Sequence, residues 1–288
     1  MDGNYNAENV YFDKDLVTTS AVGNITLTDG QATIAATGKN LKQVFDTIFV
    51  KEKNPSVTQP SVSVSLAGAG TKEVGTKVTP SYTATFNAGK YEFGPATGSA
   101  ITSWSVTDSN DAEAQSTATG SFAEFTVADD TNYKVTATGN YSEGAIPKTN
   151  VGNNYPAGKI AAGSKSATSS AITGYRNSFY GTLTNKDALT SDIIRGLNKS
   201  NKALANGNSF AITIPVGAVR VVFAYPATLR DVSSVTDENG MGAQVSSAFT
   251  KSTLSVEGLN GFTGIEYKVY TTDFGEPVAK ANKYNVTI

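Results

Sequence analysis

The sequence contains no histidine and no cysteine among its 288 residues. Without histidine, the chain lacks the usual general base near neutral pH and the commonest metal ligand. Without cysteine, it lacks thiol nucleophiles, disulfides and thiolate metal sites. Ser-His-Asp and Cys-His triads are therefore excluded. We expect a protein that is not an enzyme and that uses no cofactor or metal.

Charge and long apolar runs are also scarce. Charged residues make up 17% of the chain and the formal net charge is -2, which gives no general attraction to nucleic acid or to an anionic membrane. No apolar run approaches the ~18 residues of a membrane-spanning helix. The first twelve residues lack the basic and apolar regions of a signal peptide. We expect no nucleic-acid partner, no membrane insertion and no secretion signal.

What the chain has is glycine, tyrosine and a high proportion of serine and threonine. Threonine and tyrosine suit a pleated sheet with one wet face. Residues 61–66 alternate strictly between serine and apolar residues, as in a half-buried strand. Residues 218–225 form the most apolar run, which predicts a central strand. The composition therefore predicts a mainly β fold.

The N-terminal region, residues 1–58, is predicted to be a small α+β unit. Asp29-Gly30 within residues 24–34 is typical of a hairpin turn. A helix is predicted over residues 39–52, ending before Asn54-Pro55. Its apolar residues follow the i, i+3, i+4, i+7 spacing of one helix face: Leu41, Val44, Phe45 and Ile48. This face would serve either a local core or an oligomer interface, and these four residues are our candidates for docking.

In the region after residue 58, a set of four residues has a recognisable spacing. Trp104 lies on a predicted strand, and Asp129 is followed four residues later by Tyr133 and then by Val135. This pattern resembles the core signature of immunoglobulin-like sandwiches, in which Tyr133 would form the tyrosine corner and Val135 would replace a disulfide cysteine. We expect such a module over residues 59–172, with a loop-rich end whose segment 141–175 is a connection or an extended arm.

Residues 173–288 are predicted to form a C-terminal β-sandwich with one short helix around 187–197. The whole chain is then expected to be mainly β, with tandem immunoglobulin-like β-sandwich modules, a small N-terminal α+β unit and one or two short helices.

Three acidic segments have oxygen ligands in close sequence: 108–113, 129–130 and 237–238. The first lacks the glycine and the twelfth-position glutamate of an EF-hand loop, so β-turns are the favoured interpretation of all three. Calcium is the alternative at each. A glycosidase with two converging carboxylates also stays open, although a sugar cleft usually has several aromatic residues and the chain has one Trp.

The run from Gly38 to Pro55, followed by 58–62, resembles the front end of virion structural proteins of tailed gut bacteriophages, including the crAss-like group. Segments 129–138, 175–181 and 214–230 are similar to the same proteins. The resemblance implies a non-enzymatic particle component located in the virion, such as a head fibre, a capsid decoration protein or a tail appendage.

From this resemblance we expect a head-attached fibre or decoration protein that acts through repeated protein or glycan contacts. Its expected partners are other capsid or tail proteins, further copies of itself in a homo-oligomer (a trimer being the expected form), and a host-surface glycan or protein. The alternative is a bacterial cell-surface adhesin or carbohydrate-binding module, because immunoglobulin-like arrays serve both functions.

Overall fold

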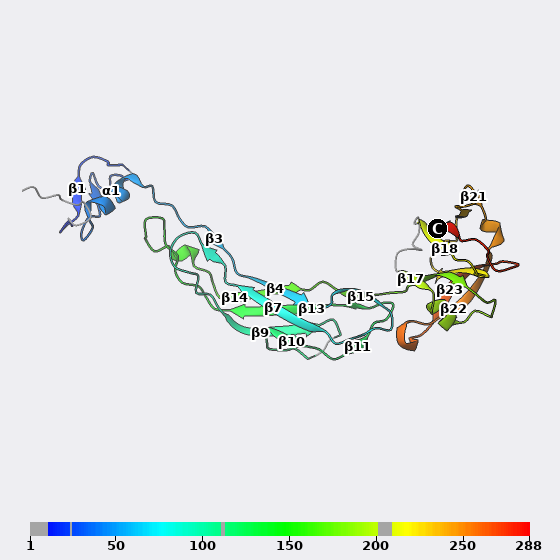
Figure 1. The fold of residues 1–288 in the computed structure, drawn as a ribbon. Helices are drawn as coiled ribbons and strands as arrows, with labels where there is room; N and C mark the ends of the chain where they lie inside the picture. Colours follow the sequence, from blue (N-terminus) through cyan, green and yellow to red (C-terminus); the bar gives the residue numbers. More distant parts are fainter. Residues whose placement is uncertain (1–10, 24, 111–112, 201–208) are drawn as a thin grey trace, which may run out of the picture.

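The computed structural model describes residues 11–23, 25–110, 113–200 and 209–288. It is mainly β, with 46% strand and 9% helix, and antiparallel sheets dominate it. The predicted fold class is therefore confirmed. The molecule is elongated, with the N-terminal unit at one end, a β-sandwich in the middle and a second β module at the other end (Figure 1). In the part of the chain described, no helix has the length and hydropathy to cross a membrane.

The N-terminal unit consists of a two-stranded sheet and one helix. Strands β1 (Leu16–Thr18) and β2 (Ala32–Ile34) pair antiparallel, and α1 (Leu41–Phe49) packs beside them. The predicted turn is present, because Asp29 and Gly30 both have positive φ and Thr28 and Gln31 exchange backbone hydrogen bonds. Pairing beyond that turn differs from the prediction: the partner of β2 is β1 rather than residues 25–28, and Asn24 lies outside the described residues.

Helix α1 is shorter than the predicted 39–52 because its N-terminus is fixed by a capping box at Asn40. The Asn40 side chain accepts from the backbone N–H of Gln43, and the Gln43 side chain accepts from the backbone N–H of Asn40, each at 2.9 Å. These two bonds satisfy orphan donors of the first turn. The helix ends at Phe49, before the extended segment that leads to the sandwich.

The central module is a β-sandwich of two three-stranded sheets. One sheet has the order β10-β7-β4 and the other β14-β13-β9. Apolar side chains of both inner faces share one core, including Tyr82 and Ala84 from the first sheet and Val106 and Ala137 from the second. Their bounds are β4 Ser61–Leu66, β7 Ser81–Asn87, β9 Ile101–Asp108, β10 Thr119–Ser121, β13 Val135–Tyr141 and β14 Gly163–Thr168.

Short strand pairs complete this module at its ends. β5 (Gly70–Glu73) runs parallel to β15 (Ile172–Tyr175), which also pairs with β12 (Asn132–Tyr133). Two further antiparallel pairs are β3 with β8 and β6 with β11, whose bounds are β3 Val57–Thr58, β6 Lys77–Val78, β8 Lys90–Tyr91 and β11 Phe125–Thr126.

Within the loop-rich segment 141–175, the structure places a strand where the sequence predicts a connection or arm. Strand β14 pairs with β13 over six residues, from Gly163↔Tyr141 to Thr168↔Thr136. Its composition, GSKSAT, has no large apolar residue on either face. Apolar alternation, the usual strand signal, is therefore missing. A 3₁₀ turn at Pro156–Gly158 precedes it.

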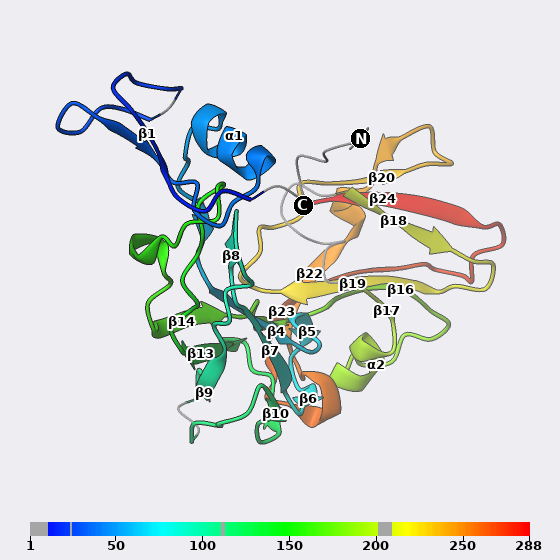
Figure 2. The same ribbon diagram turned by 90° about the vertical axis from the view of Figure 1, so that its left-hand side faces the viewer.

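The C-terminal module stacks a five-stranded sheet, β17-β16-β19-β23-β22, on a four-stranded sheet, β18-β24-β20-β21 (Figure 2). The most apolar run forms β19, which pairs with β16 on one side and β23 on the other, so the predicted central strand is confirmed. The strand bounds are β16 Ser178–Leu183, β17 Asn198–Ser200, β18 Ser209–Ile214, β19 Arg220–Pro226, β20 Ser234–Asp237, β21 Ala243–Gln244, β22 Thr250–Val256, β23 Ile265–Asp273 and β24 Asn282–Thr287.

Both faces of the five-stranded sheet are covered. Phe223 and Tyr225 of β19 point into the core between the two sheets. Val222 and Ala224 point to the opposite face, where Ile194 of α2 (Ser191–Arg195) covers them. The helix predicted around 187–197 is thus a single short turn, capped by Thr190 and ending at Gly196. Two 3₁₀ turns, Ser246–Ala248 and Leu259–Gly261, lie in connections.

Candidate functional site

The four predicted docking residues of α1 divide into two groups. Val44 and Ile48 are 1% and 6% exposed and form the core of the N-terminal unit with Ile34 and Ala36. Leu41 is half-buried. Phe45 is 48% exposed. The structure therefore places two of the candidates in the local core and leaves Phe45 facing outward.

The exposed apolar surface of the protein is concentrated in this unit. Nine large hydrophobic side chains are exposed among the described residues, and six of them lie between residues 11 and 50. They are Tyr11, Val17, Leu27, Phe45, Phe49 and Val50. Exposed apolar patches of this kind mark interaction sites in soluble proteins.

We define the aromatic face of α1 as Phe45 and Phe49. Phe49 is 72% exposed, and the two ring centroids lie 6.0 Å apart. Phe49 was not among the predicted docking residues, because the i, i+3, i+4, i+7 spacing that identified the helix runs from Leu41 to Ile48. The signal that would have found it is the i, i+4 spacing from Phe45, which places both rings on one side of the helix.

The other side of α1 faces the sandwich across a cleft of about 400 Å³, lined by Lys39, Gln43, Asp46, Thr47, Val50, Asn150 and Val151. Beside this cleft, the connecting segment 51–53 is fastened to the sandwich. Asn150 accepts from the Lys53 backbone N–H at 2.7 Å and donates to the Lys51 carbonyl at 3.1 Å. Asn153 donates to the Glu52 carboxylate at 2.9 Å. The N-terminal unit is thus joined to the sandwich by polar contacts in addition to the chain.

The residues of the immunoglobulin-like signature lie in the sandwich, where they make structural contacts. Trp104 is half-buried on β9, opposite Gly139, where an added Cβ would lie 3.0 Å from the indole ring. Val135 is fully buried in the core. The Tyr133 hydroxyl donates to the Asp108 carboxylate at 2.9 Å, whereas a tyrosine corner bonds to backbone a few residues upstream.

Asp129, the fourth signature residue, lies where the sandwich meets the C-terminal module. Its carboxylate accepts two hydrogen bonds from Arg176, both at 2.8 Å, and the same guanidinium donates to the Thr263 carbonyl at 2.7 Å. The Arg176 side chain is only 6% exposed. These hydrogen bonds hold the pKa of Asp129 below its usual range, against the opposing effect of burial.

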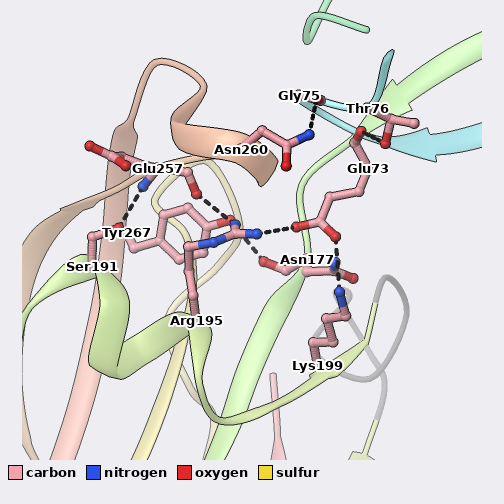
Figure 3. Close-up of polar contacts among 10 residues, drawn as sticks. All are labelled: Glu73, Gly75, Thr76, Asn177, Ser191, Arg195, Lys199, Glu257, Asn260 and Tyr267. Carbon is pink, nitrogen blue, oxygen red and sulfur yellow. Dashed lines mark hydrogen bonds and ion pairs between the residues drawn. The ribbon is translucent and has the colours of Figure 1, made fainter. Parts of the chain in front are cut away.

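A second charged cluster lies at the same junction (Figure 3). Glu73, at the end of β5, accepts from Arg195 at 2.9 Å and from Lys199 at 3.1 Å, and its side chain is 9% exposed. Burial alone would raise the pKa of Glu73, but the hydrogen bonds from Arg195 and Lys199 outweigh it and lower the pKa. Arg195 also donates to the Glu257 carbonyl at 2.8 Å.

Backbone contacts close the junction. The Leu259 N–H donates to the Val74 carbonyl at 2.7 Å, and the Asn260 side chain donates to the Gly75 carbonyl at 3.1 Å. Gly75 has φ +92, and a Cβ at this position would lie 1.9 Å from the Leu259 carbonyl oxygen. Only glycine fits such a position. We call this set of contacts, made by Glu73, Gly75, Asp129, Arg176, Arg195, Lys199, Leu259 and Asn260, the module clamp.

The clamp joins the sandwich to the C-terminal module through paired charges and backbone contacts. Its charges are paired with one another. Near the clamp, the buried Tyr267 donates its hydroxyl to the Asn177 carbonyl at 2.8 Å. Burial raises the pKa of Tyr267, so the phenol stays protonated and is a poor general base near neutral pH.

The acidic segments for which calcium was the alternative interpretation have protein partners among the described residues. Asp108 accepts from Tyr133 and from the Asn110 N–H, although positions 111–112 of that segment lie outside the described residues. Asp237 accepts from the Gly240 N–H and from Asn282, and Glu238 pairs with Lys283 at 2.8 Å. Over the described ranges, no three His, Cys, Asp or Glu side chains are grouped to hold a metal ion.

No family model matches the chain, and no match to it was found among curated proteins.

Proposed function

We propose that the chain is a non-enzymatic structural component of a bacteriophage particle, a head-attached fibre or capsid decoration protein. The observation that carries the proposal is the distribution of apolar surface along an elongated molecule (Figure 1). Of the nine exposed large hydrophobic side chains among the described residues, six lie at the N-terminal end, including Phe45 and Phe49. A long, β-rich molecule with exposed apolar side chains at one end suits a protein that is attached through that end and projects from a surface.

The body of the molecule supports this role. The outward face of sheet β14-β13-β9 presents three rows of small polar side chains, namely Ser103–Asn140–Ser164, Ser105–Thr138–Ser166 and Thr107–Thr136–Thr168. Hydrogen bonds join neighbouring side chains within each row, such as Thr136 and Thr168 at 2.9 Å. This uncharged, hydrated face suits a projecting spacer that is crowded among copies of itself. The module clamp connects this body to the next module by hydrogen bonds between charged and polar groups.

In this proposal the protein is located in the virion. Its N-terminal unit contacts capsid or tail proteins or sister chains, in a homo-oligomer for which a trimer is the expected form. Contacts of the projecting modules with a host-surface glycan or protein are weak singly and are strengthened by repetition on the particle.

A bacterial cell-surface adhesin or carbohydrate-binding module is the second candidate. The observation that favours it is the same polar face, because rows of hydroxyl and amide groups offer both donors and acceptors to the hydroxyls of a neutral sugar chain. Such a face has no large aromatic ring to stack on a sugar, so this candidate predicts weak binding per module.

The two candidates are separated by locating the protein. Antibodies raised against the chain are applied, with gold labels, to gradient-purified phage particles and to uninfected cells of the producing bacterium. The proposal predicts label on the particles and none on uninfected cells. Label on uninfected cell surfaces would overturn it in favour of the adhesin. Binding of the isolated chain to neutral polysaccharides on a glycan array measures the sugar contacts in either setting.

A further inference from the structure

We infer that a pocket at the junction of the sandwich and the C-terminal module binds one unit of a neutral sugar chain. The inference rests on one part of the proposed function, the contact of the projecting modules with a host-surface glycan, and it names the site of that contact. It concerns the isolated chain in solution, so it can fail while the particle assignment stands.

The pocket has a volume of about 430 Å³ and lies between the end of β15 and the segment that follows β19. Strand β15 is at the end of the sandwich that faces the C-terminal module (Figure 1). A volume of this size falls in the ~300–1,000 Å³ range of small-molecule sites. We call it the junction pocket, and the lining residues that matter for the argument are Asp129, Tyr175, Arg176, Pro226, Thr228 and Leu229.

The charges that line the junction pocket cancel. Among the described residues, Asp129 and Arg176 are the charged side chains of its lining, and two hydrogen bonds of 2.8 Å pair them. A charged ligand would lose its hydration without meeting an unpaired counter-charge. A purely apolar ligand would cover the carboxylate and the Thr228 hydroxyl without giving them a hydrogen bond. A neutral ligand that carries hydroxyl groups avoids both penalties.

Asp129 can accept hydrogen bonds from such a ligand while it stays paired with Arg176. An ionised carboxylate has about four acceptor sites, and Arg176 uses one on each oxygen. The Arg176 side chain is 6% exposed and the Asp129 side chain is 48% exposed, so the buried guanidinium orients a carboxylate that is half open to solvent. A carboxylate held in one orientation is suited to accept from neighbouring hydroxyls of a sugar ring.

Tyr175 gives the junction pocket an aromatic ring. It is half-buried, and its hydroxyl has no hydrogen-bond partner among the described residues. Its backbone is fixed, because Tyr175 pairs with Glu73 in the ladder of β15 and β5 and its carbonyl accepts from the Val74 N–H at 3.0 Å. Pro226 and Leu229 add further apolar surface. A sugar ring carries C–H groups on its faces and hydroxyls at its edge, so it matches a pocket lined by both an aromatic ring and a carboxylate.

The test is binding of single sugars to the full chain, followed by NMR. The probes are the methyl glycosides of glucose, galactose, mannose and N-acetylglucosamine, with glucuronic acid as the charged comparison. We expect at least one neutral glycoside to bind with a Kd of roughly 1 mM and to shift the backbone amide signals of residues 174–176 and 228–229. Glucuronic acid should bind more weakly, because the pocket offers no unpaired cation to it.

Two variants test the pocket itself. Tyr175→Ala removes the ring and should weaken binding about tenfold. Thr228→Arg adds a long side chain at an exposed position of the lining, where it occupies the pocket and competes for Asp129, and should abolish binding. The matched controls Tyr11→Ala and Thr250→Arg make the same substitutions at exposed positions outside the pocket and should leave the Kd unchanged. An unchanged unfolding temperature of Thr228→Arg shows that its loss of binding is not a loss of fold.

The inference is overturned if no neutral glycoside binds at millimolar concentration, or if binding survives Thr228→Arg. Amide shifts confined to the outward face of sheet β14-β13-β9 would also overturn it, because the sugar would then lie on the rows of small polar side chains. Preferential binding of glucuronic acid would exclude a neutral ligand. None of these results changes the immunogold labelling of phage particles, which tests the particle assignment separately.

Discussion

The carboxylate of Glu73 lies between two cations that come from another module. Arg195 is 122 residues away in the sequence and Lys199 is 126 residues away, yet both donate to it. Replacing Glu73 by Gln leaves Arg195 and Lys199 without their anionic partner. Because hydrogen bonds to charged groups contribute about 1.5–3 kcal/mol and Lys199 is partly solvated, we expect the free energy of unfolding to fall by about 1–3 kcal/mol. Urea denaturation of the full chain measures it.

The matched control is Asp46→Asn, which removes an acid from the exposed Lys42 pair and should change stability by no more than about 0.5 kcal/mol. The difference in the free energy of unfolding between Glu73→Gln and wild type should also depend on pH. Because the folded pKa of Glu73 lies below the usual glutamate value of 4.5, the stabilisation by Glu73 is present above that value and is lost as pH falls through the folded pKa. Equal effects of the two variants at neutral pH would contradict the assignment of Glu73 to the clamp.

Four tyrosine hydroxyls should resist ionisation. Burial is the first cause that raises the pKa of Tyr133, Tyr225, Tyr267 and Tyr284 above the usual value of 10.0. Unfolded tyrosines ionise near that value, so the unfolded state holds fewer protons above about pH 10 and the folded state loses stability as pH rises. We expect the tyrosinate absorbance of the native chain, which has 13 tyrosines, to be lower at about pH 11 than that of the same chain in urea. In urea all 13 should titrate together, and a native curve that coincides with the urea curve would disprove the prediction.

At the scale of single elements, α1 depends on its first turn. Asn40→Ala removes the side-chain acceptor of the capping box, a change that costs about 1 kcal/mol in helices generally. Because the N-terminal unit has a small core, we expect this loss to increase hydrogen exchange at residues 41–49 specifically. Amide exchange measured by mass spectrometry would detect it. The control Lys42→Ala changes an exposed position of the same helix and should leave the exchange pattern nearly unchanged, and similar increases in both variants would argue against the cap.

Elements with a periodic apolar pattern could be predicted from the sequence. Strand β4 has the predicted bounds, and β19 is the central strand that its composition indicates. Strand β14 could not be predicted, because its stability comes from pairing with β13 and from the Thr138–Ser166 and Thr136–Thr168 hydroxyl contacts. Those depend on register with a strand more than twenty residues away. Helix α1 was predicted too long because its ends are set by capping rather than by periodicity.

The candidate surfaces show the same limit. The i, i+3, i+4, i+7 pattern identified the helix and its core side but included Phe45, which faces outward, and left out Phe49. The spacing shows which residues could share one helix face, but the element packed against the helix decides which of them are buried. The module clamp had no local signal at all, because Glu73, Arg176 and Arg195 become neighbours only through the arrangement of the two modules.

At the scale of the whole molecule, the clamp should fix the angle between the sandwich and the C-terminal module. Gly75→Ala introduces a Cβ whose position lies 1.9 Å from the Leu259 carbonyl oxygen. The Leu259–Gly261 turn must therefore move away from the segment that follows β5. We expect this variant to loosen the junction while both sandwiches stay folded. The chain has no cysteine, so Lys165→Cys and Met241→Cys give one spin-label site in each module, at exposed positions.

Spin-label distance distributions then measure the junction directly. A clamped pair of modules predicts one narrow distribution in the otherwise unaltered chain and a broader one with Gly75→Ala. Gly70→Ala is the matched control, because Gly70 also has a positive φ, +121, but an added Cβ there meets nothing within 4 Å. It imposes similar backbone strain without touching the neighbouring module. If Gly70→Ala broadens the distribution as much as Gly75→Ala, strain within the sandwich would account for the effect. If neither variant broadens it, the modules are held by contacts other than the close approach of Gly75 to Leu259.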